Sequence, residues 1–310
     1  MSKVVNNELK IEGSTFYVSG GRGFIGSRFL EMARYKNAKV LELSRSEFEG
    51  KTLSISKTDF IVHLAGQKSS KLAFKEPAET LDAEFKMALS LLEAARVMKQ
   101  PPRKILLISS VGVYDGEGLV SESDANFVNS IYTASKTNIE NLGLSYALEY
   151  NLPVTIARLS NVYGPGQTVD ALIPSIIIQM AKNISEHGNI TLGNIQAIRD
   201  FIFVDDVVQG LLHLLLSSNS TGKVFNVSTG IGHSVKEIVS LLSEILNYNG
   251  SIDVNPSKVR INERKVLVAN NQRLKLSTGW KTKFSLKDGL IKTASHYMKN
   301  IKLCGEGNVL

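Results

Sequence analysis

The chain carries a tyrosine and a lysine four residues apart, in the run Tyr132-Thr133-Ala134-Ser135-Lys136. Residues at this spacing lie on the same face of a helix, about one turn apart. An ammonium group beside a phenol stabilises the phenolate, which makes Tyr132 a candidate for proton transfer. The same spacing is common on solvated helix faces, so the pair predicts chemistry only where other motifs support it.

A glycine-rich turn near the start of the chain gives such support. The run from Thr15 to Ser19 is short and apolar, as in a strand, and an amphipathic helix is expected after the glycines, to about Tyr35. Glycines between a strand and a helix let the backbone approach a pyrophosphate, whose charge the helix N-terminus stabilises. The residues expected to contact a dinucleotide here are Gly20, Gly23, Phe24, Ile25 and Gly26.

The end of the second expected strand, Lys39 to Leu43, bears on the choice of cofactor. In dinucleotide-binding folds an acidic residue at this point often binds the ribose 2′-hydroxyl. Ser44 stands where the acid is expected, and Arg45 follows it. Without a carboxylate a 2′-phosphate is not repelled, and a guanidinium can bind one. The two residues therefore favour NADP(H), with NAD as the alternative; Arg45 could otherwise be a solvated loop residue.

Two further strands end in small residues. The apolar run from Asp59 is followed by residues that would let the cofactor pass close to the backbone; these are Leu64, Ala65 and Gly66. The run from Lys104 to Ile108 leads into Ser109-Ser110. A serine at the C-terminal end of a parallel strand lies where ligands bind in such sheets.

Strands alternate with helices along the first half of the chain. A long helix is expected from Ala78 to Lys99, another from Tyr132, and a strand from Val154 to Arg158. This alternation predicts an α/β fold with a doubly wound, Rossmann-type parallel sheet and a smaller C-terminal substrate-binding lobe. We expect the dinucleotide-binding domain to span 1–162, with 199–230 returning to it, and the lobe to span 163–198 and 231–310.

Composition narrows the class of protein. The 310 residues are 43% hydrophobic, as in soluble globular proteins, and the single cysteine, Cys304, excludes a disulfide framework and a cysteine metal site. We expect a cytoplasmic protein without a metal, and no run approaches the roughly 20 apolar residues of a membrane-spanning helix. The formal charge of +7 comes from scattered lysines, so we expect an anionic small molecule rather than nucleic acid as the partner.

The motifs, in their order, resemble those of the extended short-chain dehydrogenase/reductase family, in its branch of NAD(P)-dependent nucleotide-sugar epimerases, dehydratases and 4-keto reductases. The segments that carry the resemblance are GGRGFIGSRF, HLAG, SSVGVY, YTASK, RLSNVYGPG, RDFIFVDD and FNVSTG. The resemblance covers nearly the whole chain. It also implies a homodimer that pairs through helices 78–99 and 132–150.

The resemblance implies roles for particular residues. Tyr132 would transfer a proton to or from the sugar, Lys136 would support the tyrosine and hold the nicotinamide ribose, and Ser110 would hydrogen-bond the reacting oxygen. Tyr132 and Lys136 would thus also contact the cofactor, and Ser110 would contact the substrate. The residues implied to contact the nucleotide diphosphate of the substrate are Asn161, Arg199 and Arg260. Asn161 could instead be a turn residue, and the two arginines could be surface charges.

Three departures from the family pattern matter. Val111-Gly112 stands where dehydratases carry an Asp-Glu pair, which argues against 4,6-dehydration, because water loss needs an acid and a base. Glu84 stands where many members have an asparagine. The segment between Arg45 and Asp59 is short, so the usual third strand is expected to be missing or altered.

Three functions follow as hypotheses. The leading one is NADPH-dependent reduction of the C4 keto group of a dTDP-, CDP- or GDP-linked 4-keto-6-deoxyhexose. The second is a nucleotide-sugar 4-epimerase with tightly bound NAD, which would use the same residues. The third is a regulatory protein that binds NADP without catalysis. The presence of Ser110, Tyr132 and Lys136 counts against it, because a regulatory binder does not need them.

Overall fold

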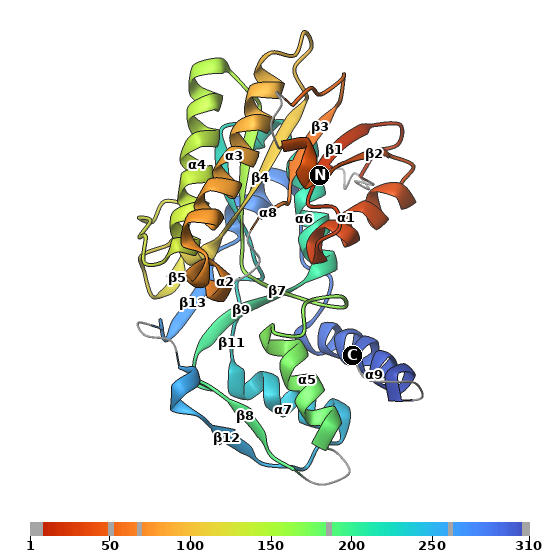
Figure 1. Ribbon diagram of the computed structural model, residues 1–310, viewed down its shortest axis with the longest axis vertical. Coiled ribbons are helices and arrows are strands. Elements are labelled where there is room, and N and C mark those ends of the chain that lie inside the picture. The colour runs from red at the N-terminus through yellow and green to blue at the C-terminus, as the bar shows by residue number, and fades with distance from the viewer. Residues whose placement is uncertain (1–8, 49–52, 67–69, 184–187, 260–262, 306–310) are drawn as a thin grey trace, which may run out of the picture.

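The computed structural model describes residues 9–48, 53–66, 70–183, 188–259 and 263–305. A large α/β layer structure occupies one end of the molecule, and a smaller group of helices and strands occupies the other (Figure 1). Arg260, predicted to contact the substrate, lies outside the described residues.

The larger part is built on a six-stranded sheet in which every pairing is parallel. The strand order is β10-β6-β4-β3-β1-β2. The strands are β1 (Thr15–Ser19), β2 (Lys39–Leu43), β3 (Phe60–His63), β4 (Lys104–Ser110), β6 (Val154–Leu159) and β10 (Lys223–Val227). Parallel neighbours need crossover connections, and α-helices supply most of them.

Helices cover both faces of this sheet, as the near-continuous apolar strands require. Along β3, Phe60 and Val62 pack with α1 (Phe24–Tyr35) and α6 (Val204–Leu216) in one buried cluster. Ile61 points to the other face and joins the cluster beneath α3 (Pro77–Arg96) and α4 (Ile131–Tyr150). The alternation follows from the period of two in a strand, and the predicted doubly wound fold is confirmed.

The smaller part combines a second sheet, of order β11-β9-β13-β5 with β7 beside β9, and a pair of strands, β12-β8. Three helices, α5, α7 and α9, pack around a second apolar cluster with β7, β8, β9 and β12 (Figure 1). The elements are β5 (Gly118–Val120), β7 (Asn161–Tyr163), β8 (Ile190–Leu192), β9 (Ile198–Phe203), β11 (Gly232–Ser234), β12 (Ile252–Val254), β13 (Val266–Ala269), α5 (Leu172–Asn183), α7 (Val235–Leu246) and α9 (Leu286–Gly305).

The division into a domain and a lobe stays a prediction, and one element illustrates how the parts connect. The short helix α8 (Gln272–Thr278) and Trp280 follow the strands of the smaller part in sequence. Leu274 and Trp280 are nevertheless buried in the cluster formed by α1, α6 and the six-stranded sheet. The chain thus returns to the large sheet after α7 and before α9.

The described part of the segment between Arg45 and Asp59 contains no strand, in line with the expectation that the usual third strand is missing or altered. Residues Arg45–Phe48 form the short 3₁₀ helix η1, and the next described strand is β3. Among the described residues β2 is therefore the edge of the sheet, without a further strand beside it. The remaining short elements are α2 (Ser70–Lys75), η2 (Val111–Val113), η3 (Ser218–Ser220) and η4 (Pro256–Lys258). No helix in the described part of the chain is long and apolar enough to cross a membrane.

A lysine is buried at the start of the central strand β4. Lys104 is 3% exposed, and its ammonium donates a hydrogen bond to Thr221 Oγ1. Burial lowers the pKa of Lys104 from 10.5 to about 8, because the charged form loses its hydration.

We predict that Lys104→Met raises the free energy of unfolding at pH 7, by about 2 kcal/mol. Between pH 8 and 10.5 the unfolded chain binds a proton that the folded chain does not, so this group's contribution to stability rises with pH in that window. The advantage of the variant should therefore shrink by pH 10. Urea unfolding at both pH values measures it, with the exposed Lys39→Met as control. No gain at pH 7, or the same gain at both pH values, would contradict the prediction.

Candidate active site

Most residues predicted to act on a ligand lie at one edge of the large sheet. The strands β1, β3, β4 and β6 run parallel, so their carboxyl ends meet there, at the edge where ligands bind in open α/β sheets. The glycine turn follows β1, the run from Leu64 to Gly66 follows β3, and Ser110 ends β4. This arrangement brings the predicted cofactor residues next to the predicted catalytic ones.

The glycine turn is packed against the segment after β3. Gly20 has a φ of +74°, and a Cβ there would lie 2.4 Å from the backbone nitrogen of Ala65. A Cβ on Gly26 would lie 2.0 Å from Gly20 O. Only glycine fits these two positions, because another residue would collide with backbone.

The start of α1 after this turn is suited to an anion. Its N-cap is Gly23, and no side chain caps the first turn. Amide groups of the first helical turn have no partners within the helix, and they favour negative charge. The turn therefore fits the pyrophosphate of a dinucleotide, with Phe24 and Ile25 as the first helical residues.

A buried histidine joins β1 to β3 directly below this turn. His63 Nδ1 lies 2.7 Å from Ser19 Oγ, which couples the ends of the two strands. Burial, and second the charge of Lys136, lower the pKa of His63 to about 3. His63 is therefore neutral at physiological pH. Its Nε2 is buried without a hydrogen-bond partner among the described residues.

A capping box sets where α4 begins and therefore where Tyr132 lies. Ser130 Oγ accepts from the backbone N–H of Thr133, and the Thr133 hydroxyl pairs with the Ser130 N–H in return. Such reciprocal bonds satisfy amide groups that the helix leaves free. Tyr132 then stands in the first turn, with Lys136 Nζ 5.7 Å from the centre of its ring.

Ser110 and Tyr132 both lie close to Gly112. Ser110 Oγ accepts a hydrogen bond of 3.1 Å from Gly112 N. A Cβ built on Gly112 would lie 3.3 Å from Ser110 Oγ and 4.0 Å from Tyr132 Cε1. The absence of a side chain at Gly112 therefore keeps the space between the two hydroxyl-bearing residues open.

An arginine that the sequence did not single out holds this turn in place. Arg264 donates to Gly112 O at 2.7 Å and to Tyr114 O at 2.6 Å. It comes from the segment before β13, about 150 residues away in sequence. The family resemblance pointed to the nearby Arg260, and no local pattern marks Arg264, because only the folded chain brings its guanidinium to the end of β4.

Lys136 forms a buried ion pair with Glu84 of α3. Lys136 Nζ lies 2.9 Å from Glu84 Oε2 and 3.1 Å from Oε1, and the two side chains are 8% and 2% exposed. Gly66 lies against the pair, since a Cβ there would be 2.8 Å from Lys136 Nζ. The departure at Glu84 therefore falls directly on a predicted catalytic residue.

The end of β2 holds a carboxylate that the sequence pattern did not predict. The backbone N–H and the hydroxyl of Ser44 both donate to Glu47 Oε2, at 2.6 and 2.8 Å. The acid absent at position 44 is thus supplied from three residues further on. Arg45 is exposed beside it, and the structure pairs it with no residue of the described chain.

Two of the predicted substrate residues, Asn161 and Arg199, lie on strands of the smaller part. Asn161 is exposed at the start of β7, which follows β6 directly. Arg199 of β9 donates to the backbone carbonyls of Ile198, Arg264 and Lys265, and lies 3.5 Å from Glu263. Its guanidinium thus braces the segment that carries Arg264. Contact of Asn161 or Arg199 with a diphosphate stays a prediction.

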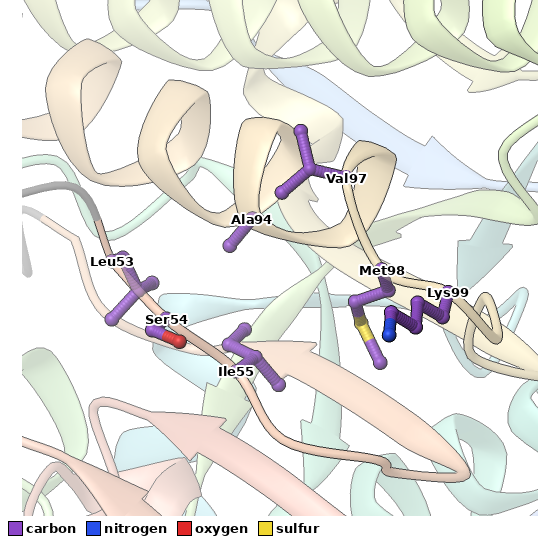
Figure 2. Close-up of a pocket in the computed structure, with 7 residues that line it drawn as sticks. All are labelled: Leu53, Ser54, Ile55, Ala94, Val97, Met98 and Lys99. Carbon is purple, nitrogen blue, oxygen red and sulfur yellow. The ribbon is translucent and has the colours of Figure 1, made fainter.

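One hollow of the molecule lies elsewhere. It is lined by the segment before β3 and the end of α3, through Leu53, Ser54, Ile55, Ala94, Val97, Met98 and Lys99 (Figure 2). At 1.5 Å per residue, Ala94 is about 15 Å along the helix from Glu84. This hollow is therefore separate from the candidate active site. Among the described residues no cluster of acidic, histidine or cysteine side chains could hold a metal ion.

Comparison with known proteins identifies the class of enzyme. Over residues 16–228 the chain matches the NAD dependent epimerase/dehydratase family, and it belongs to that family. GDP-6-deoxy-D-mannose reductase of Pseudomonas aeruginosa is 31% identical over 253 residues, which are 79% of this chain and 82% of that protein. The chain is accordingly an NAD(P)-dependent enzyme of the oxidoreductase type.

Two solved structures agree with this assignment. RMD from Pseudomonas aeruginosa, complexed with NADPH, superimposes with a TM-score of 0.83 at 26% identity and covers 93% of this chain and 99% of its own. UDP-glucose 4-epimerase from Thermotoga maritima, with UDP-glucose, gives a TM-score of 0.81 at 25% identity with the same two coverages. The relatives therefore include both a reductase and an epimerase.

Proposed function

We propose that this protein uses NADPH to reduce the C4 keto group of a nucleotide-linked 4-keto-6-deoxyhexose. The observation that carries the proposal is the grouping of Ser110, Tyr132 and Lys136 beside a dinucleotide turn in a chain similar to a GDP-6-deoxy-D-mannose reductase. Position 111–112 carries Val and Gly, without the carboxyl groups that loss of water would need. A GDP-linked sugar is the first substrate to test.

The mechanism follows from where the side chains lie. The bound cofactor would supply the hydride for C4. Tyr132 would donate its proton to the C4 oxygen, so that the carbonyl becomes a hydroxyl. Ser110 Oγ, which like the tyrosine lies close to Gly112, would hydrogen-bond the same oxygen and hold it in line. Lys136 would hold the nicotinamide ribose, and the backbone of Gly20, Gly23 and Gly26 would hold the pyrophosphate.

Reduction should be visible as loss of the absorbance of NADPH when the protein meets a GDP-linked 4-keto-6-deoxyhexose. Tyr132→Phe should lower the turnover about 10²- to 10⁴-fold, the usual contribution of an acid–base group. Its affinity for NADPH should stay near that of the wild type, because the ring is kept. Wild-type turnover from the Phe variant would show that another group donates the proton. NADPH left untouched with dTDP-, CDP- and GDP-linked sugars alike would refute the reductase.

A nucleotide-sugar 4-epimerase with tightly bound NAD is the second candidate, and the end of β2 favours it. The carboxylate of Glu47 at Ser44 is the type of group that binds a ribose 2′-hydroxyl. An epimerase regenerates its cofactor within the site. Interconversion of a pair of 4-epimeric nucleotide sugars without added cofactor would therefore establish this reading in place of the first.

Two variants test how the end of β2 selects the cofactor. Arg45→Asp should weaken the binding of NADPH about tenfold more than that of NADH, since a cation near the 2′-phosphate becomes an anion. Glu47→Gln should act in the opposite direction, because it removes a carboxylate that a 2′-phosphate must displace from Ser44. Calorimetric titration with both cofactors measures the two ratios. Equal ratios in the wild type and in both variants would contradict NADP(H) selection here.

We further propose a homodimer that pairs through α3 and α4. These two helices pack side by side on one face of the large sheet (Figure 1). Large apolar side chains remain exposed on them, with Phe85 40%, Leu148 83% and Tyr150 49% exposed. Light scattering should give the mass of a dimer, and the double variant Phe85→Glu, Leu148→Glu should give a monomer. Tyr35→Glu, on the exposed side of α1, is the control. A monomeric wild type at micromolar concentration would refute the dimer.

A further inference from the structure

The ion pair between Glu84 and Lys136 is unusual for its burial beside a predicted reaction centre. Ion pairs at the surface contribute little because water screens both charges. Here both groups are nearly inaccessible, and each carboxylate oxygen of Glu84 is within hydrogen-bond distance of the same ammonium. Removing one partner would leave the other charge buried and uncompensated.

The charged and titratable groups near the pair differ in how far a partner compensates them. His63 of β3 is neutral at physiological pH because burial lowers its pKa to about 3. One turn along α4, Glu140 is paired with Arg158 of β6 at 2.9 and 2.6 Å. Ser110 of β4 carries no charge. Two further cations lie on neighbouring elements: Arg264 is held by the carbonyls of Gly112 and Tyr114, and the exposed Lys75 is on α2, which packs against α3 and α4. They stay the same whatever occupies position 84, so Glu84 changes the charge at Lys136 itself.

We propose that Glu84 is a positioning residue that holds Lys136 and neutralises it, so that the site accepts the oxidised cofactor as well as the reduced one. The inference rests on the proposed function, which places Lys136 at the nicotinamide ribose. The nicotinamide ring is cationic in NADP⁺ and neutral in NADPH. An uncompensated ammonium beside it repels the oxidised form, and a compensated one does not. A reductase gains from this balance because it binds one form and releases the other in each cycle.

Four proteins form a charge cycle that tests the inference: the wild type, Glu84→Gln, Lys136→Met, and the double variant. The quantity measured is the ratio of the dissociation constants of NADP⁺ and NADPH, from calorimetry without any sugar. Glu84→Gln should raise this ratio about tenfold, because it leaves a cation, and Lys136→Met should lower it about tenfold, because it leaves an anion. The double variant should return to within about threefold of the wild type. Hydrogen bonds that Lys136→Met removes from the ribose affect both forms and cancel in the ratio.

Glu140→Gln is the matched control, since it breaks the other buried ion pair of α4. It should lower the melting temperature and leave the cofactor ratio unchanged. A ratio that Glu84→Gln does not move, in a protein that melts cooperatively, overturns the inference. If Glu84→Gln does not fold, the comparison of Lys136→Met with the double variant decides, because adding Glu84→Gln should then raise the ratio about tenfold. Binding of both forms without reduction of any 4-keto sugar would refute the reductase alone, whereas a wild type that binds neither form overturns both.

Discussion

The parallel pairing of the large sheet is the constraint on which the site depends. Because every strand in it runs the same way, the chain must cross back between successive strands, mostly through an α-helix, and all the carboxyl ends meet at one edge. The ends of β1 and β3 come so close there that a Cβ at Gly20 would meet the backbone of Ala65. The glycine turn is thus needed for the fold itself as well as for room at a phosphate. A substitution at Gly20 or Gly26 would harm both, so loss of binding in such a variant cannot be separated from loss of structure.

The second constraint is a set of two buried ion pairs, each with one member on helix α4. Lys136 pairs with Glu84 of α3, and Glu140, one turn later, pairs with Arg158 of β6. The first pair ties α4 to the neighbouring helix, and the second ties it to the sheet. Replacing such pairs by apolar residues is often neutral for stability, so stability alone does not explain a charge beside Tyr132. Under the proposed function, the position of Lys136 next to the tyrosine ring would give that pair a chemical use, whereas Glu140 and Arg158 join the helix to the sheet.

Local patterns predicted the elements well, and long-range contacts explain what they missed. Lys39–Leu43 forms the strand read from its apolar run, and Ser130 and Thr133 begin α4 one residue before Tyr132. Glu84 and Lys136 are 52 residues apart, so no local pattern pairs them. A signal was nevertheless present, because Glu84 shares a helix face with Thr80, Ala88 and Leu91, all of which are buried. A carboxylate on an apolar stripe must find a partner. The contact of Glu47 with Ser44 also had a sequence signal, because Ser44 and Glu47 have the spacing of a capping box.

The end of β2 and the Glu84–Lys136 pair both bear on the choice between reductase and epimerase. Under the proposed function, the first would lie at the ribose that carries the 2′-phosphate and the second at the nicotinamide ribose. An epimerase keeps its cofactor, so tight binding of both forms serves it, and the Glu47 carboxylate at Ser44 would suit a ribose that has no phosphate. A reductase must exchange the cofactor in every cycle, and an exposed Arg45 beside a displaceable carboxylate suits a 2′-phosphate that arrives and leaves. Neutralisation of Lys136 by Glu84 suits exchange too, because neither oxidation state is then held by a strong charge. The predicted catalytic residues are common to both proposed reactions. Acceptance of both cofactor forms would serve either enzyme, so the Glu47 carboxylate beside Arg45 bears more directly on the choice between reductase and epimerase than Glu84 does.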